Sequence, residues 1–321
     1  MKAILAKQFG GYDGLELVEM PKPSGEGVLV RVAAAGVTPL EHTILSGAFP
    51  RAKAPLVLGN EGAGMIMRAG IPGPTIGTRV AFTGGYGVVV NGSWAEYVLV
   101  HPDDLLPVPD DVSDVVAASL PVAYLTAYIT LAQAGFEPGK TVFAPAIGGS
   151  VGNATYQLAK ALGASAVIST AGSPEKAAQA QSLGYEKVID LSAESIRDGV
   201  RRMTEGRGAD IVIESLGGAF TGASLGVLAP GGTLVTLGYS AGTKAAIDVT
   251  DLIWKGARMF GFMLAAQTPA IKQDAWKKVM ALVASGAIKP LVEQTYPLEQ
   301  AADALRHLHE RRPFGKIVLE L

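Results

Sequence analysis

Five consecutive small residues near the middle of the chain, Gly148, Gly149, Ser150, Val151 and Gly152, have the composition of a phosphate-binding turn. Glycine has no Cβ, so the backbone there can turn sharply and come close to a pyrophosphate group. The residues that follow have the apolar spacing of a helix. The free N–H groups and the positive dipole end of such a helix attract an anion. The chemistry predicted for this stretch is the binding of a dinucleotide phosphate.

The spelling of this turn is not the strict G-x-G-x-x-G fingerprint. It reads A-x-x-G-x-V-G, from Ala146 through Gly149 and Val151 to Gly152. A second interpretation therefore stays open, in which the stretch is an ordinary buried strand-to-helix turn that happens to contain glycines. Gly152 is expected to let the helix pack closely on the preceding strand.

The elements around the turn alternate between strand and helix patterns, which favours the nucleotide-binding interpretation. Alternation of this kind predicts crossover connections and a parallel sheet. Six strands make the expected fold class α/β, a doubly wound parallel (Rossmann) sheet with its ligand crevice at the carboxyl ends of the strands. The expected strands are residues 141–146, 166–170, 187–190, 210–214, 231–238 and 258–263, and the expected helices are 173–183, 192–204 and 248–255.

The end of the second strand gives a prediction about the cofactor. An NAD-binding unit would place Asp or Glu there to bind the ribose 2′-hydroxyl. No acid stands at this strand end, where Thr170 is followed by Ser173 and Lys176. A hydroxyl and an ammonium group could bind a 2′-phosphate, which predicts NADPH. In the alternative, Ser173 is only a helix N-cap and Lys176 only a solvated charge.

Composition excludes several classes of function. The chain has 321 residues, of which 49% are hydrophobic and 17% charged, with no cysteine and a net charge of −2. Disulfides, thiolate nucleophiles and cysteine-bound zinc are therefore ruled out, and nothing predicts a nucleic-acid partner. The longest apolar runs are too short to span a membrane. The first twenty residues read as a strand rather than a signal peptide, so a cytoplasmic location is expected.

The N-terminal third differs from the middle of the chain. Short β patterns separated by Gly and Pro predict a β-rich, partly closed barrel-like domain, and Asn91-Gly92 predicts a tight hairpin between residues 88–90 and 93–98. Residues 115–135 are expected to be helical, and this stretch contains Pro121. The last strand pattern, 317–321, would rejoin this domain. The expected domains are 1–119 together with 264–321, and 120–263, with the active site in the cleft between them.

Several motifs together resemble one known family, the zinc-free quinone oxidoreductases related to zeta-crystallin, within the medium-chain dehydrogenase/reductase superfamily. The resemblance runs nearly from end to end and implies a GroES-like domain beside the Rossmann domain. It also implies NADPH-dependent transfer of hydride to a quinone or an α,β-unsaturated carbonyl (an enone or enal). The motifs are Gly36-Val37-Thr38-Pro39, PLVLGNEGAG at 55–64, Ala95-Glu96-Tyr97, Leu120-Pro121, Leu125-Thr126-Ala127, the glycine turn, TAGSPEK at 170–176, Pro230-Gly231-Gly232 and Gly315-Lys316-Ile317-Val318.

The resemblance also implies what replaces a metal. Zinc-dependent alcohol dehydrogenases of the superfamily have a cysteine at position 38 and a histidine at position 60, where this chain has Thr38 and Asn60. Glu61 alone cannot hold a catalytic zinc, which takes three protein ligands, so no metal site is predicted. Thr38 and Asn60 are expected to donate hydrogen bonds to the substrate oxygen. Tyr86 is a further candidate donor, or else an ordinary aromatic residue at the barrel rim.

The remaining site residues follow from the resemblance and from strand ends. Thr126 is expected to face the nicotinamide and its ribose. Ser215 and the pair Gly238-Tyr239, after the fourth and fifth strands, are expected to border the nicotinamide half. The apolar edge strand 258–263 would pair with a second copy of the chain and form a homodimer.

Three functions remain open at this point. The first is an NADPH-dependent quinone or enone reductase. The second is a zinc-free alcohol or carbonyl dehydrogenase with the same cofactor. The third is an NADPH-binding protein without catalysis, since folds of this kind also occur in non-enzymes.

Overall fold

The computed structural model describes residues 1–70 and 73–321, and these residues divide into two compact units. The first unit comprises Met1–Val122, Gln267–Ala284 and Pro290–Leu321. The second comprises Ala123–Ala266 and Ser285–Lys289. Each unit has its own buried apolar cluster, around Phe82 and Trp94 in the first and around Phe143 and Ile168 in the second.

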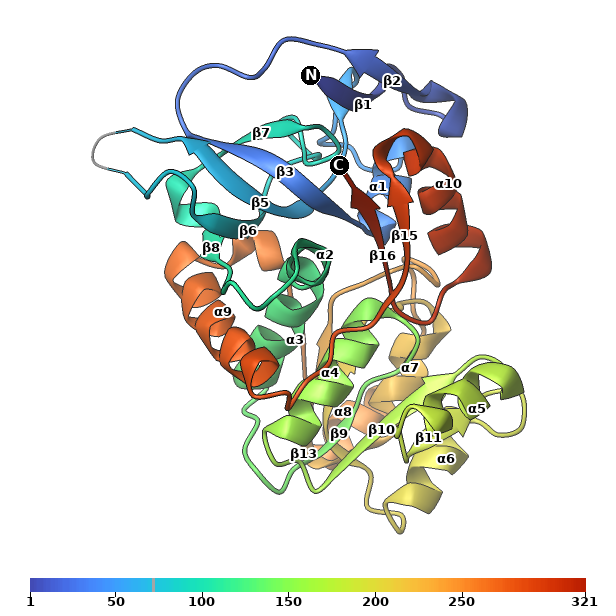
Figure 1. The fold of residues 1–321 in the computed structure, drawn as a ribbon. Helices are drawn as coiled ribbons and strands as arrows, with labels where there is room; N and C mark the ends of the chain where they lie inside the picture. Colours follow the sequence, from blue (N-terminus) through green and yellow to red (C-terminus); the bar gives the residue numbers. More distant parts are fainter. Residues whose placement is uncertain (71–72) are drawn as a thin grey trace. The chain divides into compact units, whose positions relative to one another are not determined.

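The second unit is a parallel sheet with helices in the connections (Figure 1, mostly green to orange). Its strand order is β11-β10-β9-β12-β13-β14, so the direction of winding reverses between β9 and β12. This is the doubly wound arrangement, which places the ligand crevice outside the carboxyl ends of β9 and β12. The predicted six-stranded parallel fold is confirmed. The strands are β9 Thr141–Phe143, β10 Ala166–Ala171, β11 Val188–Asp190, β12 Ala209–Glu214, β13 Leu228–Thr236 and β14 Arg258–Gly261.

Three helices of this unit begin at a residue whose side chain caps the helix. Ser173, Ser195 and Asp248 accept backbone N–H bonds at the starts of α5, α6 and α8, as short polar side chains do at N-caps. The bounds of the helices are α3 Pro121–Gln133, α4 Ser150–Ala161, α5 Pro174–Ser182, α6 Ile196–Met203, α7 Ala219–Leu225, α8 Val249–Lys255 and η3 Leu264–Ala266.

The first unit is built on a mainly antiparallel sheet in the order β15-β16-β3-β5-β6-β8, with β7 also paired to β3, and a smaller sheet in the order β2-β1-β4. Over the described residues the larger sheet does not close on itself into a barrel. The strands are β1 Lys2–Ala6, β2 Leu15–Glu19, β3 Val28–Val37, β4 Leu56–Val57, β5 Glu61–Arg68, β6 Arg79–Thr83, β7 Tyr97–Val100, β8 Leu105–Pro107, β15 Val292–Pro297 and β16 Lys316–Glu320.

The C-terminal strands β15 and β16 belong to this same sheet. β16 pairs antiparallel with β3, and β15 pairs parallel with β16 across the helical connection between them (Figure 1, red). Neither β15 nor the long helix α9 was anticipated from the sequence pattern. The helical elements are η1 Tyr12–Gly14, α1 Pro39–Leu45, η2 Pro102–Asp104, α2 Asp114–Ser119, α9 Pro269–Ala284, η4 Leu298–Gln300, α10 Ala301–Arg306 and η5 His307–Arg311.

One local prediction is wrong. The hairpin at Asn91-Gly92 does not form, because the Asn91 side chain instead accepts the Val57 backbone N–H (3.0 Å) and β7 pairs with β3. The helical stretch predicted over 115–135 consists of two helices, α2 and α3. Pro121 begins the second helix, at a position where its missing N–H costs no hydrogen bond.

Candidate active site

The glycine turn connects β9 to α4 in the second unit. Gly149 is the N-cap of α4 with φ −79°, and no side chain caps the helix. The first N–H groups of a helix have no intrahelical partner, so this 12-residue helix presents donors suited to an anion. The left-handed residue of the turn is Ala146, with φ 65°. A Cβ on Gly152 would overlap the carbonyl oxygens of Pro145 and Ala146, so the close approach of α4 to this turn needs glycine.

The end of β10 is fastened to the same turn. Thr170 Oγ1 accepts the Ala146 N–H at 2.9 Å, and the Thr170 carbonyl accepts the Ile147 N–H at 2.9 Å. Two short bonds of this kind fix the turn against the neighbouring strand. The predicted residues Gly148 to Gly152 and Thr170 are thus brought together.

Ser173 and Lys176 lie at the start of α5, just past this strand end. Ser173 Oγ accepts the Lys176 N–H at 3.4 Å as the helix N-cap. The Ser173 hydroxyl also donates to the carboxylate of Glu175, and this bond lowers the pKa of Glu175. An acid therefore stands beside the two residues predicted to bind a 2′-phosphate.

The loops after β12 and β13 are held by a buried acid that sequence reasoning missed. The Glu214 side chain is fully buried, and one carboxylate oxygen accepts the N–H groups of Leu216 and Gly217 at 2.5 and 2.8 Å. The other accepts hydroxyl groups from Thr221 and Thr236. The sequence signal that could have identified Glu214 is its place as an acidic residue at the end of a largely apolar strand.

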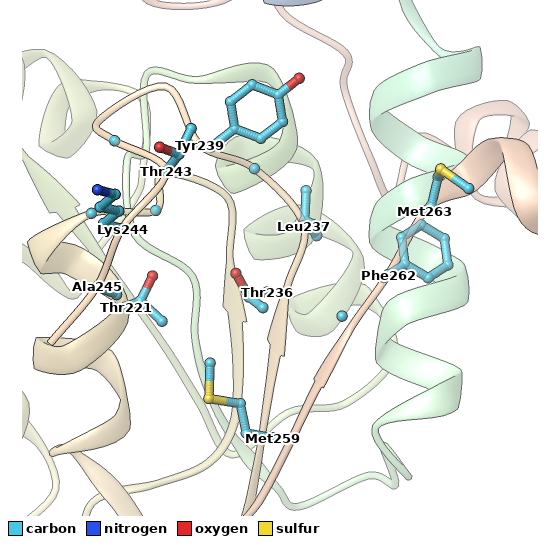
Figure 2. Close-up of a pocket in the computed structure, with 15 residues that line it drawn as sticks. Thr221, Thr236, Leu237, Tyr239, Thr243, Lys244, Ala245, Met259, Phe262 and Met263 are labelled. Carbon is cyan, nitrogen blue, oxygen red and sulfur yellow. The ribbon is translucent and has the colours of Figure 1, made fainter. Parts of the chain in front are cut away.

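A cavity of about 570 Å³ lies beside these loops. Figure 2 shows threonine hydroxyls, the Lys244 side chain and the apolar side chains of Met259, Phe262 and Met263 around it. Its lining includes the predicted residues Gly238 and Tyr239. Gly238 lies against Ser215, because a Cβ there would overlap the Ser215 carbonyl oxygen. The two predicted loops therefore meet.

Thr126 lies on α3 with 4% of its surface exposed. Its carbonyl oxygen accepts the Thr130 hydroxyl at 2.7 Å. Its predicted role toward the nicotinamide ribose stays a prediction.

In the first unit, Thr38 and Glu41 form a capping box at the start of α1. The Thr38 hydroxyl accepts the Leu40 N–H at 3.2 Å, and Glu41 Oε2 accepts the Thr38 N–H at 2.7 Å. The Thr38 hydroxyl lies 2.5 Å from the same carboxylate oxygen. Capping boxes satisfy exposed helix ends in many proteins, but here both side chains are buried, with 4% and 1% exposed.

Asn60 and Tyr86 belong to the same neighbourhood. The Asn60 N–H donates to Glu41 Oε1 at 2.9 Å, and its side-chain amide donates to the carbonyls of Gly84 (2.8 Å) and Tyr86 (3.1 Å). Both amide hydrogens are thereby used within the protein. The structure brings Thr38, Asn60 and Tyr86 together through Glu41 and these backbone contacts.

The Tyr86 hydroxyl also forms hydrogen bonds within the protein. It donates to Asp104 Oδ2 at 2.9 Å and accepts the His101 N–H at 2.8 Å, and Asp104 pairs with Lys272 at 2.8 Å. Burial is the main cause that raises the pKa of Tyr86. This tyrosine would have to release Asp104 before it could donate to a substrate, and its predicted role as a donor stays a prediction.

Glu61, Lys316 and Gly36 complete the cluster. The Glu61 carboxylate forms a buried ion pair with Lys316 through Oε1, and its Oε2 accepts the Val122 N–H at 2.7 Å. A Cβ on Gly36 would overlap the Glu61 carboxylate. Because Glu61 is tied to Lys316 and positions 38 and 60 provide a hydroxyl and an amide, these residues do not fit the donor set of a catalytic zinc.

Metal-ligating side chains do not cluster elsewhere in the described chain. Across residues 1–70 and 73–321, no group of three or more His, Cys, Asp or Glu side chains could hold a metal ion. The absence of metal from the reaction stays a prediction. Sequence reasoning missed Glu41 and Lys316; the T-x-x-E spacing from Thr38 to Glu41 was the available signal for the first.

Comparison with known proteins decides the family. Residues 24–110 match the alcohol dehydrogenase GroES-like domain, and residues 150–285 match the zinc-binding dehydrogenase domain. The quinone oxidoreductase of Mus musculus is 31% identical, over 100% of this chain and 98% of its own length. The chain belongs to the quinone oxidoreductase family of the medium-chain dehydrogenase/reductase superfamily.

Solved structures of this family share the fold. The quinone oxidoreductase of Pseudomonas syringae superposes with a TM-score of 0.89 at 31% identity, covering 100% of this chain and 99% of the other. A mycobacterial protein solved in complex with NADPH superposes with a TM-score of 0.89 at 30% identity, with full coverage of both chains. The chain is therefore an oxidoreductase that binds a nicotinamide cofactor. Within its described residues, no helix is both long enough and apolar enough to cross a membrane.

Proposed function

We propose that this oxidoreductase uses NADPH to reduce quinones or α,β-unsaturated carbonyls, without a metal. The observation that supports this most is the cluster at positions 38, 60 and 61. There a hydroxyl, an amide and a lysine-paired carboxylate occupy positions where zinc-dependent relatives would need metal ligands. Reduction of a simple ketone needs an acid to stabilise localised alkoxide charge. A quinone or an enone spreads the developing charge, so a few hydrogen-bond donors suffice.

The residues of the second unit fit the proposed cofactor. The uncapped start of α4 suits the pyrophosphate. Ser173 and Lys176 suit the 2′-phosphate, and the loops at Ser215 and at Gly238-Tyr239, with Thr126, are proposed to border the nicotinamide half. When bound, the cofactor supplies the hydride. The protein's part is to bind it, orient the acceptor and supply the proton.

We propose that the Thr38 hydroxyl donates a hydrogen bond to the oxygen atom of the substrate. Of the three predicted donors, Thr38 is the one whose hydroxyl contacts the Leu40 N–H and the carboxyl group of Glu41. The Asn60 amide and the Tyr86 hydroxyl donate to other groups of the protein. We therefore propose that Asn60 acts mainly by fixing the loop around Glu41.

Oxidation of NADPH with a panel of acceptors, followed by its absorbance, tests the function. The expected result is turnover with enones and quinones and none with simple ketones. Turnover with ketones or alcohols would favour the carbonyl dehydrogenase instead. Tight NADPH binding with no turnover of any acceptor would favour the non-catalytic alternative.

A further inference from the structure

The buried cluster of the first unit holds more negative than positive side chains. Glu41 and Glu61 are 1% and 0% exposed, and Lys316 is 3% exposed. Lys316 is the cation that pairs with this cluster, and its contact is with Glu61. An isolated charge in such surroundings carries a large desolvation cost. One carboxyl group of the two is therefore favoured in its neutral, protonated form.

The contacts identify Glu41 as the neutral group. Glu61 has both the ammonium of Lys316 and the Val122 N–H as partners. Glu41 has only uncharged partners, namely the backbone N–H groups of Thr38 and Asn60 and the Thr38 hydroxyl. An ion pair favours the charged form of a carboxyl more than such dipoles do. The proton therefore belongs on Glu41.

The position of that proton follows from the same contacts. Oε1 of Glu41 accepts the Asn60 N–H, whereas Oε2 lies 2.5 Å from the Thr38 hydroxyl oxygen. A proton on Oε2 points to Thr38, whose oxygen also accepts the Leu40 N–H. With both acceptor positions of that oxygen filled, its own hydrogen is free to donate elsewhere. With Glu41 ionised, the hydroxyl would instead donate to the carboxylate.

We propose that Glu41 is the proton source of the reaction and that Thr38 relays its proton to the substrate. The inference rests on the proposed function. An enone that has accepted hydride at its β-carbon is an enolate, and the protein's part is to protonate its oxygen. The Thr38 O–H bond breaks as its proton goes to the enolate oxygen, and the Glu41 O–H bond breaks as its proton restores the hydroxyl. Water reprotonates Glu41 after release of the enol product.

The electrostatics agree with this geometry. Burial is the largest cause acting on Glu41 and raises its pKa above the usual range for glutamate, against opposing contributions from Thr38, Lys316 and Asn60. The charged group that acts on Glu41 is Lys316 from β16, which is also the ion-pair partner of Glu61 from β5. The next titratable groups along α1 and η5 are His42 and His309, whose rings stack with centroids 3.6 Å apart. The pKa of His42 is lowered, mainly by burial.

The test is the pH dependence of single-turnover enone reduction at saturating NADPH. In the wild type the rate should fall about tenfold per pH unit above the pKa of Glu41, because only the protonated carboxyl can act. Glu41→Gln should lose this limb and fall about 100-fold in rate, the usual range for loss of a general acid. Quinone reduction should change less, since water readily protonates a delocalised hydroquinone anion.

Threonine variants keep the test valid if Glu41→Gln fails to fold. Thr38→Val removes the proposed relay hydroxyl, which also caps α1, and should abolish the same limb, whereas Thr38→Ser retains both functions of the hydroxyl and should keep it. His42→Gln should also keep it, which separates Glu41 from the nearby histidines. NADPH affinity should be unchanged throughout.

These measurements distinguish a failure of the proton relay from a failure of the proposed reductase function. A wild-type rate without the limb, or a limb that persists in Thr38→Val, overturns the relay while leaving the reductase function standing. An absence of turnover with every acceptor, despite NADPH binding, refutes the proposed function itself.

Discussion

Position 38 shows how one substitution changes the chemistry that a shared fold can perform. A thiolate there could bind a metal, whereas the hydroxyl of Thr38 accepts the Leu40 N–H and lies 2.5 Å from Glu41 Oε2. The same T-x-x-E spacing that begins α1 also places a carboxyl beside the proposed substrate donor. In the proposed mechanism, helix capping and proton transfer would use the same two side chains.

Thr38→Val tests the role of this hydroxyl in rate. Loss of a donor to a developing oxyanion costs roughly 10²–10³ in kcat, so enone turnover should fall by that factor and quinone turnover by less. Asn60→Leu should mainly lower thermal stability, because its amide holds the carbonyls of Gly84 and Tyr86. Steady-state kinetics and melting curves distinguish the two. Full activity of Thr38→Val with every acceptor would mean that Thr38 only fills the vacated metal position.

The proposed preference for NADPH over NADH can be tested at two neighbouring residues near the start of α5, Glu175 and Lys176. A charge-assisted contact contributes about 1.5–3 kcal/mol, so Lys176→Ala should weaken NADPH about 10- to 100-fold and leave NADH nearly unchanged. Glu175→Gln is the matched variant and should strengthen NADPH, because it removes a carboxylate held beside Ser173. Fluorescence titration with both cofactors measures this. Equal losses for both cofactors in Lys176→Ala would show that Lys176 does not bind the phosphate.

Residues were predictable where the signal is local. The glycine turn could be located from five consecutive residues. The cluster of Glu41, Glu61 and Lys316 could not, because three distant segments, α1, β5 and β16, meet there and no spacing in the sequence records this.

At the scale of elements, the start of α4 depends on one close contact. Gly152 packs where any Cβ would overlap the carbonyl oxygens of Pro145 and Ala146. These are backbone atoms of a turn that Thr170 holds in place. The helix would therefore have to move away from the turn if a side chain were added.

Gly152→Ala should consequently weaken NADPH and NADH by the same factor, at least about tenfold, and lower stability by about 1–3 kcal/mol, the usual cost of overpacking. Gly70→Ala is the control, since a Cβ there meets nothing within 4 Å. Calorimetric binding and thermal unfolding measure both effects. Unchanged affinity for both cofactors would show that the position of α4 does not matter for binding.

Element types were predictable where hydrophobic patterns were long, and the errors have specific causes. The sequence pattern placed a turn at Pro230-Gly231-Gly232, but β13 runs through it with a register shift against β12. The hairpin prediction failed because the side chain of Asn91 bonds to Val57, a partner 34 residues away. Both errors involve contacts between segments far apart in the chain, which a short window of sequence does not contain.

For the whole molecule, the exposed edge of the parallel sheet is the feature with a consequence for assembly. β14 is paired on one side, to β13, and contains Met259 and Phe260. Ile253 and Trp254, on the preceding helix α8, are 67% and 82% exposed. An unpaired apolar edge is a template for pairing with another chain. We propose that two copies pair through β14.

Light scattering should then give twice the chain mass of 33.1 kDa. Amide hydrogen exchange in β14 should slow as protein concentration rises from the monomer to the dimer range, whereas the β2 edge serves as the control and should not change. A single-chain mass at every concentration, or a dimer with unaltered β14 exchange, would rule out this interface.

The most direct test of the whole account is enone reduction by NADPH before and after exhaustive treatment with a strong chelator, with zinc content measured on the same samples. A metal-free enzyme should show equal turnover in both samples and no stoichiometric zinc, because the Thr38, Asn60 and Glu61 side chains do not form a ligand set. Turnover that is lost on chelation and restored by added zinc would contradict it.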